Sequence, residues 1–246
     1  MRMDKNPIGR GMPSSLTYAS LERIHVGRPV ERLSWISDAC ARKVVLDIGC
    51  FDETALGKRG TPHWLHGRLL AKASRVIGID ISDKIPNAGV VSGANGVILK
   101  RDAAKMDLWG IDVKCVDVAV AGEFIEHIEN PLDFFRSVKN SLSGCDFILS
   151  TPNGVCFANT LMGCIRREVQ HPDHLHNFTY KTLNTMCMRA GFQAWEIVPY
   201  RFYATEMIMA SGGVKKVFVQ LVQSCIRAVE WCFPLLSFGY IVRIRV

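Results

Sequence analysis

Apolar and polar positions follow two patterns along this chain, short continuous apolar runs and longer segments with helical spacing. Turn residues bound each apolar run, as is typical of strands that are buried on both faces. Strands are predicted at 44–48, 76–80, 96–99, 116–121, 146–150, 192–198 and 240–246. Because helical patterns lie between many of these runs, the chain is expected to form βαβ units around a parallel sheet. The last run alternates apolar residues with arginines, which favours an antiparallel or edge strand.

Capping residues mark several of the expected helices in addition to their spacing. Asn130 is expected to cap a helix that Pro131 opens, and Thr179 is expected to cap another that Gly191 ends. Caps and spacing predict helices over 14–40 (one or two, the second opening at Pro29), from Thr61, over 130–142, over 179–191 and over 214–229.

Composition narrows the class of protein but does not name a function. The 246 residues are 48% hydrophobic and 22% charged, which suits one large α/β domain and argues against disorder. The net charge of +7 permits an anionic partner, but the basic residues are scattered, which favours an ordinary solvated surface. Nine cysteines without a Cys-x-x-Cys pair, and a polar start without a signal core, favour a reducing, cytoplasmic location.

Three acids are expected at the carboxyl ends of neighbouring strands, where open α/β sheets bind their ligands. Asp47 ends the first predicted strand, Asp80 the second, and Asp102 follows the third. A carboxylate at the end of the second strand is suited to accept hydrogen bonds from two ribose hydroxyls. Gly49 directly follows the first strand and allows a ligand to approach the backbone closely. The pattern predicts a nucleoside-binding edge of the sheet.

A nicotinamide dinucleotide fits this edge less well than a cationic ligand does. Dinucleotide sites use Gly-x-Gly-x-x-Gly in a short turn, so that the pyrophosphate meets a helix N-terminus. Here the turn continues from Gly49 through Cys50 and Phe51 to Asp52 and Glu53. Two acids would therefore lie where a pyrophosphate binds.

Four segments together resemble the class I S-adenosylmethionine-dependent methyltransferases. They are Val45-Leu46-Asp47-Ile48-Gly49-Cys50, Gly78-Ile79-Asp80, Glu123-Phe124-Ile125-Glu126-His127 and Ser150-Thr151-Pro152-Asn153. The resemblance implies an α/β, Rossmann-like fold with a seven-stranded, mostly parallel sheet, an antiparallel last strand and helices on both faces. It also implies a methyltransferase domain over 41–246, preceded by a basic arm and helices over 1–40.

The resemblance implies a role for individual residues toward S-adenosylmethionine. Asp47 and Gly49 would line the methionine end, Asp80 would bind the ribose hydroxyls, and Asp102 would contact the adenine amino group. The full set of implied cofactor-binding residues is Asp47, Gly49, Cys50, Asp80, Ile81, Asp102, Ala103 and Glu123. The chain departs from the family pattern at Phe51, which stands where a second glycine is usual, and the turn over 50–60 is longer than usual.

The segment from Glu123 to His127 resembles the ubiquinone-type O-methyltransferases and the small-RNA 2′-O-methyltransferases. By this resemblance Glu123, Glu126, His127 and His174 would hold a divalent metal such as Mg²⁺, Mn²⁺ or Zn²⁺, which would orient and acidify a hydroxyl acceptor. The alternative is a metal-free site in which His127 is the catalytic base. A histidine-rich loop over 171–176 more often forms hydrogen bonds than binds a metal by itself.

Several functions remain open at this stage. The long connection over 153–178 is expected to cover the acceptor, and its mixture of apolar and charged residues suits a small-molecule, lipid or glycan acceptor. RNA 2′-O-methylation and a non-catalytic binding or scaffold module are the alternatives, and a nucleic-acid partner is disfavoured by the scattered basic residues.

The C-terminal helical segment raises the question of membrane contact. Its uncharged runs are shorter than the roughly 20 residues that a spanning helix needs. An interfacial helix with Lys215, Lys216 and Arg227 on its polar side, and hence a peripheral membrane location, is one interpretation. A helix that covers the sheet explains the same stripe more simply and is the favoured expectation.

Overall fold

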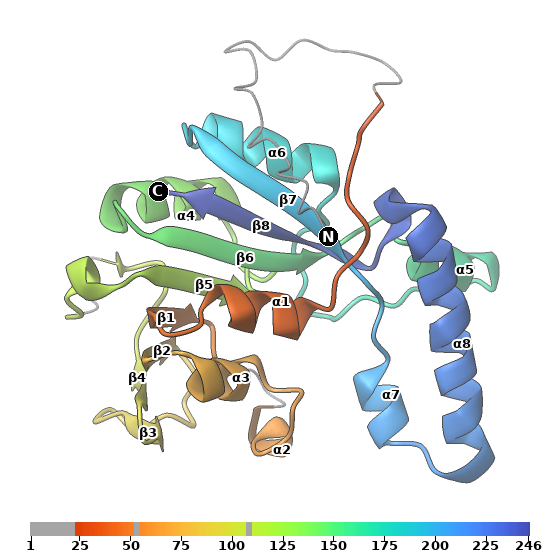
Figure 1. Ribbon diagram of the computed structural model, residues 1–246, viewed down its shortest axis with the longest axis horizontal. Helices are drawn as coiled ribbons and strands as arrows, with labels where there is room; N and C mark the ends of the chain where they lie inside the picture. The colour runs from red at the N-terminus through yellow and green to blue at the C-terminus, as the bar shows by residue number, and fades with distance from the viewer. Residues whose placement is uncertain (1–22, 52–54, 107–109) are drawn as a thin grey trace, which may run out of the picture.

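One eight-stranded sheet forms the centre of the protein (Figure 1). The computed structural model describes residues 23–51, 55–106 and 110–246. The strand order is β3-β4-β2-β1-β5-β6-β8-β7. The strands are β1 (Val44–Ile48), β2 (Arg75–Asp80), β3 (Val90–Gly93), β4 (Gly96–Lys100), β5 (Val118–Gly122), β6 (Asp146–Pro152), β7 (Ala194–Tyr200) and β8 (Gly239–Arg245).

The predicted fold class is confirmed, with one more strand than the seven expected. Strands β4, β2, β1, β5 and β6 are parallel, and β8 lies antiparallel between β6 and β7. The additional strand, β3, pairs antiparallel with β4 at the edge of the sheet. It carries only Val90 and Val91 as apolar residues, and Val91 faces solvent, so no apolar run marked it.

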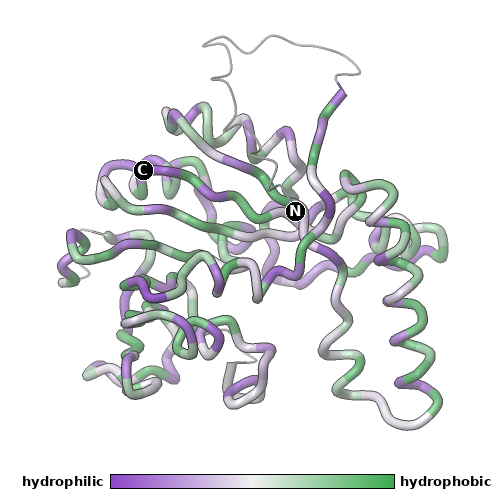
Figure 2. The backbone as a smooth tube through the Cα atoms, viewed as in Figure 1, coloured by the Kyte–Doolittle hydropathy of each residue, from purple (hydrophilic) through white to green (hydrophobic). Residues whose placement is uncertain are grey.

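Helices cover both faces of the sheet, as expected. The helices are α1 (Arg32–Ala39), α2 (Ala55–Lys58), α3 (Leu65–Lys72), α4 (Pro131–Ser141), α5 (Phe157–Cys164), α6 (Tyr180–Arg189), α7 (Thr205–Met209) and α8 (Gly213–Cys232), with short 3₁₀ turns at Val113–Cys115 and Pro234–Leu236. Phe135 of α4 and Leu183 of α6 pack on one face of the sheet, and Ile36 of α1 and Leu69 of α3 pack on the other. Figure 2 shows the apolar residues concentrated in the central strands and along α8.

Two expected helix starts are wrong, and local hydrogen bonds explain both. The helix expected from Thr61 begins at Leu65, because the Thr61 N–H and hydroxyl both donate to the Lys58 carbonyl and close a turn. The helix expected to open at Pro29 begins at Arg32, because Val30 is extended and pairs with Tyr200. The expected first part of that helix, and the basic arm, fall mostly on residues 1–22, which lie outside the described residues.

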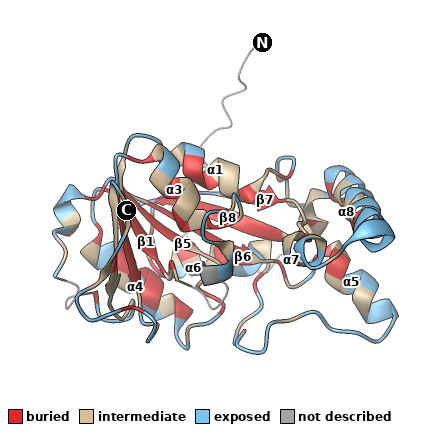
Figure 3. Ribbon diagram, turned by 90° about the horizontal axis from the view of Figure 1, so that it is seen from below, coloured by how far each residue is buried: buried red, intermediate tan, exposed pale blue. Residues whose placement is uncertain are grey.

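The expectation that the C-terminal helix covers the sheet is also wrong. Helix α8 contacts α5, α7 and the 3₁₀ turn that follows it, and it stands at one end of the molecule with α7 (Figure 3). Its apolar residues Val214, Val217, Phe218 and Leu221 are exposed. Helical spacing identifies an apolar face but not what covers it. Within the described residues, no helix has the length and apolar character needed to cross a bilayer.

Candidate active site

The first turn of the candidate site follows β1 and depends on a glycine conformation. Gly49 has φ +69°, in the left-handed region that favours glycine, and its N–H donates to the Ile79 carbonyl at 2.9 Å. A Cβ at this position would lie 2.5 Å from Cδ2 of Phe124, which belongs to the segment after β5. The turn is thus packed directly beneath the segment that carries the candidate catalytic residues.

Asp80 ends β2 and holds the same turn from the neighbouring strand. Its Oδ2 accepts a hydrogen bond from the Phe51 N–H at 3.0 Å, and its Oδ1 accepts one from the Ser82 N–H at 2.9 Å. Burial raises the pKa of Asp80 above its usual value. A carboxylate offers about four lone-pair directions, so two remain for the hydroxyls of a ribose. Ile81 follows directly and is largely exposed.

Phe51, the residue that departs from the family pattern, therefore has an identified structural role. Its N–H reaches Asp80, and its side chain packs with Cys50 and Trp64 in a small apolar cluster. Cys50 is buried there, and its carbonyl accepts a hydrogen bond from the Trp64 indole at 3.3 Å. The longer turn retains the contact between the first and second strands, although residues 52–54 lie outside the described part of the chain.

Asp102 and Ala103 lie beyond the end of β4, the neighbour of β2. Asp80 pairs with Lys100 across the ladder, which places Asp102 two residues beyond that rung. The Asp102 carboxylate accepts a hydrogen bond from the Ala104 N–H at 2.9 Å and lies 3.3 Å from Lys105 Nζ. The structure thus brings Asp80 and Asp102 to one edge of the sheet.

Asp47 lies deeper than the other two acids. Its carboxylate is buried, and its Oδ2 lies 2.8 Å from Nδ1 of His66 on α3, whose Nε2 lies 2.9 Å from the Ser92 hydroxyl. Asp47 therefore contacts a helix on one face of the sheet. The sequence patterns described above do not place His66 in this site. Its position three residues before the buried Leu69, on the same side of the helix, was the available signal.

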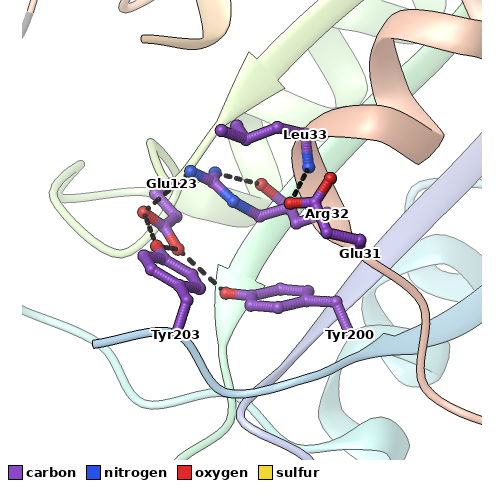
Figure 4. Close-up of polar contacts among 7 residues, drawn as sticks. Glu31, Arg32, Leu33, Glu123, Tyr200 and Tyr203 are labelled. Atoms are coloured by element: carbon purple, nitrogen blue, oxygen red, sulfur yellow. Dashed lines mark hydrogen bonds and ion pairs between the residues drawn. The ribbon is translucent and has the colours of Figure 1, made fainter. Parts of the chain in front are cut away.

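Glu123 follows β5 and is the centre of a polar network that joins distant segments (Figure 4). Its backbone has φ +53°. Its carboxylate accepts hydrogen bonds from the Tyr200 hydroxyl at 2.9 Å and the Tyr203 hydroxyl at 2.7 Å, and lies 3.4 Å from the Arg32 guanidinium. Arg32 also donates to the Ser150 hydroxyl at 3.1 Å. Burial, reinforced by the Glu123 charge, raises the pKa of both tyrosines, which remain protonated donors.

Glu126 lies three residues further along the same segment and is almost completely buried. Neither carboxylate oxygen has a hydrogen-bond partner among the described residues. Burial, and then the neighbouring Glu123 carboxylate, raise the pKa of Glu126 to about 8. Its main-chain carbonyl accepts hydrogen bonds from the N–H groups of Leu175 at 2.8 Å and His176 at 3.2 Å. These bonds hold the histidine-rich loop against the segment after β5.

Three histidines meet where these two segments touch. The His127 and His174 ring centroids are 4.7 Å apart, and His171 lies 5.9 Å from His127 and 5.7 Å from His174. Ring nitrogens of the three lie within 4.8 Å of one another, close enough to share a metal ion. Burial and the other imidazoles lower the pKa of His127 and of His174, which favours neutral rings. Neutral imidazoles can bind a metal or accept a proton.

The structure brings together two of the four metal ligands that the resemblance implies. His127 and His174 are brought together, and His171 joins them. Glu126 offers two carboxylate oxygens without partners, whereas the Glu123 carboxylate already contacts a guanidinium and two hydroxyls. Neither carboxylate belongs to the histidine cluster. The structure therefore supports three histidines as candidate ligands for a divalent cation, rather than the implied set as a whole.

Comparison with known proteins places this arrangement in a family. A family model described as "Methyltransferase domain" matches residues 25–197. The chain therefore belongs to the methyltransferase-domain family, and it is an S-adenosylmethionine-dependent methyltransferase of class I, as predicted. No curated protein matches the chain.

Several solved structures have a similar fold. The small RNA methyltransferase HEN1 superposes with a TM-score of 0.53 at 17% identity, over 92% of this chain and 27% of that one. The methyltransferase domain of the bacterial CtHen1-CN gives 0.50 at 16% identity, over 88% and 98%. A SAM-dependent methyltransferase from Archaeoglobus fulgidus gives 0.49 at 16% identity, over 86% and 93%. At these identities the likeness shows the fold alone.

Proposed function

We propose that this methyltransferase methylates a hydroxyl oxygen of a small-molecule, lipid or glycan acceptor. The observation that carries the proposal is the position of His127, five residues beyond the carboxyl end of β5. Its imidazole is solvent-accessible on one side, and partial burial together with the neighbouring His171 lowers its pKa. A hydroxyl must lose its proton as it accepts a methyl group, and a neutral imidazole can take that proton. The free cysteines of the chain are in keeping with a cytoplasmic location.

In this proposal each part of the site has a separate task. S-adenosylmethionine would supply the methyl group: as the acceptor oxygen forms a bond to the methyl carbon, the methyl–sulfur bond would break, giving a methyl ether and S-adenosylhomocysteine. Asp80 binds the ribose, Asp102 and Ala103 flank the adenine, and Gly49 leaves room beside the backbone. His127 accepts the hydroxyl proton. The segment over 153–178, which includes α5, covers the acceptor.

The test is methyl transfer to a panel of hydroxyl-bearing small molecules, lipids and glycans, measured as labelled product. His127→Asn is expected to lower kcat by about 100-fold or more, the usual contribution of a general base. Binding of S-adenosylhomocysteine should not change. His25→Asn, an exposed histidine before α1, is the matched control. If His127→Asn transferred methyl groups as fast as the wild type, His127 would not be the catalytic base.

Metal assistance is the variant of this proposal that the histidine cluster supports. His127, His171 and His174 would hold the ion, which would orient and acidify the acceptor hydroxyl. Titration with Zn²⁺ or Mn²⁺ should then show one site that His171→Ala and His174→Ala each weaken by at least tenfold, the scale of a lost ligand. Activity that survives chelation, with no ion bound, would favour the metal-free base.

RNA 2′-O-methylation is the second candidate function, because a three-histidine site can serve a ribose hydroxyl equally well. Its supporting observations are the cluster and the net charge of +7. RNA binding that weakens steeply with salt, together with methylation of a 3′-terminal ribose, would favour this candidate over the other acceptors. A chain that binds neither cofactor nor acceptor would instead be a binding or scaffold module.

A further inference from the structure

An apolar stripe on helix α8 faces solvent. It consists of Val214, Val217, Phe218 and Leu221, whose exposed fractions are 88%, 65%, 63% and 62%. Their spacing of three, four and seven residues places them on one side of the helix. The side of α8 that packs on the protein is a different one, marked by the buried Val219 and Ile226. The four residues are called the α8 stripe below.

A shallow groove continues the α8 stripe toward helix α5. Its volume is about 350 Å³, and Leu221 belongs to both the stripe and the groove. Phe157, Leu161, Leu221, Val222, Cys225, Ile226 and Val229 line the groove. Ile165 beyond α5, and Met207 and Met209 on α7, are further exposed apolar residues of this end of the molecule. An apolar surface of this extent usually marks an interaction site.

The charges around the α8 stripe are mostly basic. Helix α8 carries Lys215, Lys216 and Arg227 and has no acidic residue before Glu230, which is buried. Neither Lys215 nor Lys216 has an ion pair within the described residues, and both are exposed. Arg227 donates to the Phe202 carbonyl at 2.8 Å and so points toward the protein. The α8 stripe is thus flanked, at the start of the helix, by the two exposed lysines.

We propose that the α8 stripe and its groove dock on an anionic lipid bilayer, with α8 lying in the plane of the headgroups. An interfacial helix of this kind buries its apolar side among the acyl chains and directs lysines and arginines toward anionic headgroups. The stripe lies on a helix at one end of the molecule (Figure 3), which allows a flat surface to approach it. The docking surface does not depend on which acceptor is methylated.

Flotation of the full chain with lipid vesicles tests this proposal. Vesicles of phosphatidylcholine are compared with vesicles that also contain about a quarter phosphatidylglycerol, an anionic lipid. The wild type is expected to bind the anionic vesicles, and added salt should weaken that binding. The triple variant Val217→Ser, Phe218→Ser, Leu221→Ser should lower the bound fraction by about tenfold or more. Lys215→Gln with Lys216→Gln should reduce the preference for anionic lipid.

The matched control is Val91→Ser on β3, an exposed apolar residue on another part of the surface. It should bind vesicles as the wild type does. Binding of S-adenosylhomocysteine is measured for every variant, because unchanged affinity shows that the variant is folded and separates this surface from the proposed catalytic site. A loss of vesicle binding by such a folded variant is then caused by the change in the α8 surface.

Three outcomes would overturn the proposal. Wild-type protein that binds anionic vesicles no better than neutral ones would lack the docking surface. A triple variant that binds as the wild type does would show that the stripe is not the contact. A dimer that forms without lipid, and that the triple variant converts to monomer in sedimentation analysis, would show that a second copy covers the stripe.

Discussion

Asp80 offers a quantitative test of the nucleoside site, because its carboxylate holds the turn after β1 and is also proposed to bind the ribose, and these two roles can be measured separately. Two of its hydrogen bonds go to the N–H groups of Phe51 and Ser82 and hold the turn. We expect two more to go to the ribose hydroxyls. A hydrogen bond to a charged group contributes about 1.5–3 kcal/mol, so loss of both ribose contacts should cost about 3 kcal/mol or more. That loss corresponds to a roughly 100-fold weaker Kd.

The assay is calorimetric titration with S-adenosylhomocysteine and with its 2′,3′-dideoxy analogue, on wild type and Asp80→Ala. The wild type should prefer the natural ligand by about 100-fold, and the variant should bind both ligands with similar, weak affinity. Asp83→Ala is the control, because Asp83 is exposed and pairs only with Lys100. If Asp80→Ala weakened both ligands equally and kept the wild-type preference, Asp80 would act through the turn and the ribose assignment would be refuted.

Two further predictions concern stability. Burial raises the pKa of the Glu230 carboxyl to about 7 from 4.5, so the folded state holds this proton more tightly than the unfolded state does. Ionisation of Glu230 should therefore lower the free energy of unfolding by up to about 3 kcal/mol as pH rises from 4.5 to 7. In urea unfolding curves measured across this range, Glu230→Gln should remove that contribution, while the contribution of Glu126, whose pKa is also raised, should persist. Gly239→Ala would place a methyl group 2.2 Å from a ring carbon of Tyr200 and should lower the free energy of unfolding by about 3 kcal/mol or more. Gly163→Ala on α5, where nothing lies within 4 Å, should instead stabilise the chain slightly, and equal effects of the two substitutions on thermal unfolding would contradict the packing analysis.

Most of the sheet could be predicted from sequence because its central strands are buried on both faces. Such strands appear as continuous apolar runs, and the acid after each run marks the ligand-binding edge. Edge strand β3 could not be found this way, because an exposed residue such as Val91 interrupts the apolar pattern. Helix starts at Leu65 and Arg32 were also missed, since turn bonds and strand pairing outweigh capping preferences.

The candidate site was only partly predictable, because its polar contacts join residues that are far apart in the chain. Glu123 was visible from its segment, but Arg32, Tyr200 and Tyr203 carry no local signal that they converge on its carboxylate. Arg32 begins a helix on one face of the sheet, Tyr200 ends strand β7, and Tyr203 lies three residues beyond it. Only the three-dimensional arrangement of these segments shows that the carboxylate of a candidate metal ligand is already surrounded by three donors.

The antiparallel pairing of β7 and β8 has a consequence for how this enzyme can diversify. Tyr200 and Gly239 are partners on the last rung of that ladder, so residues 201–238 leave the sheet and return to it at neighbouring points. The excursion contains α7 and α8. Strands β1, β2 and β4, which the candidate cofactor-binding residues Asp47, Asp80 and Asp102 end or follow, lie in the opposite half of the sheet. The length of the excursion can change without altering strand register, because loop closure penalises extra residues only weakly. Related chains can therefore differ in the length of this excursion beyond Tyr203, which contacts Glu123, while the strand register of the sheet is retained.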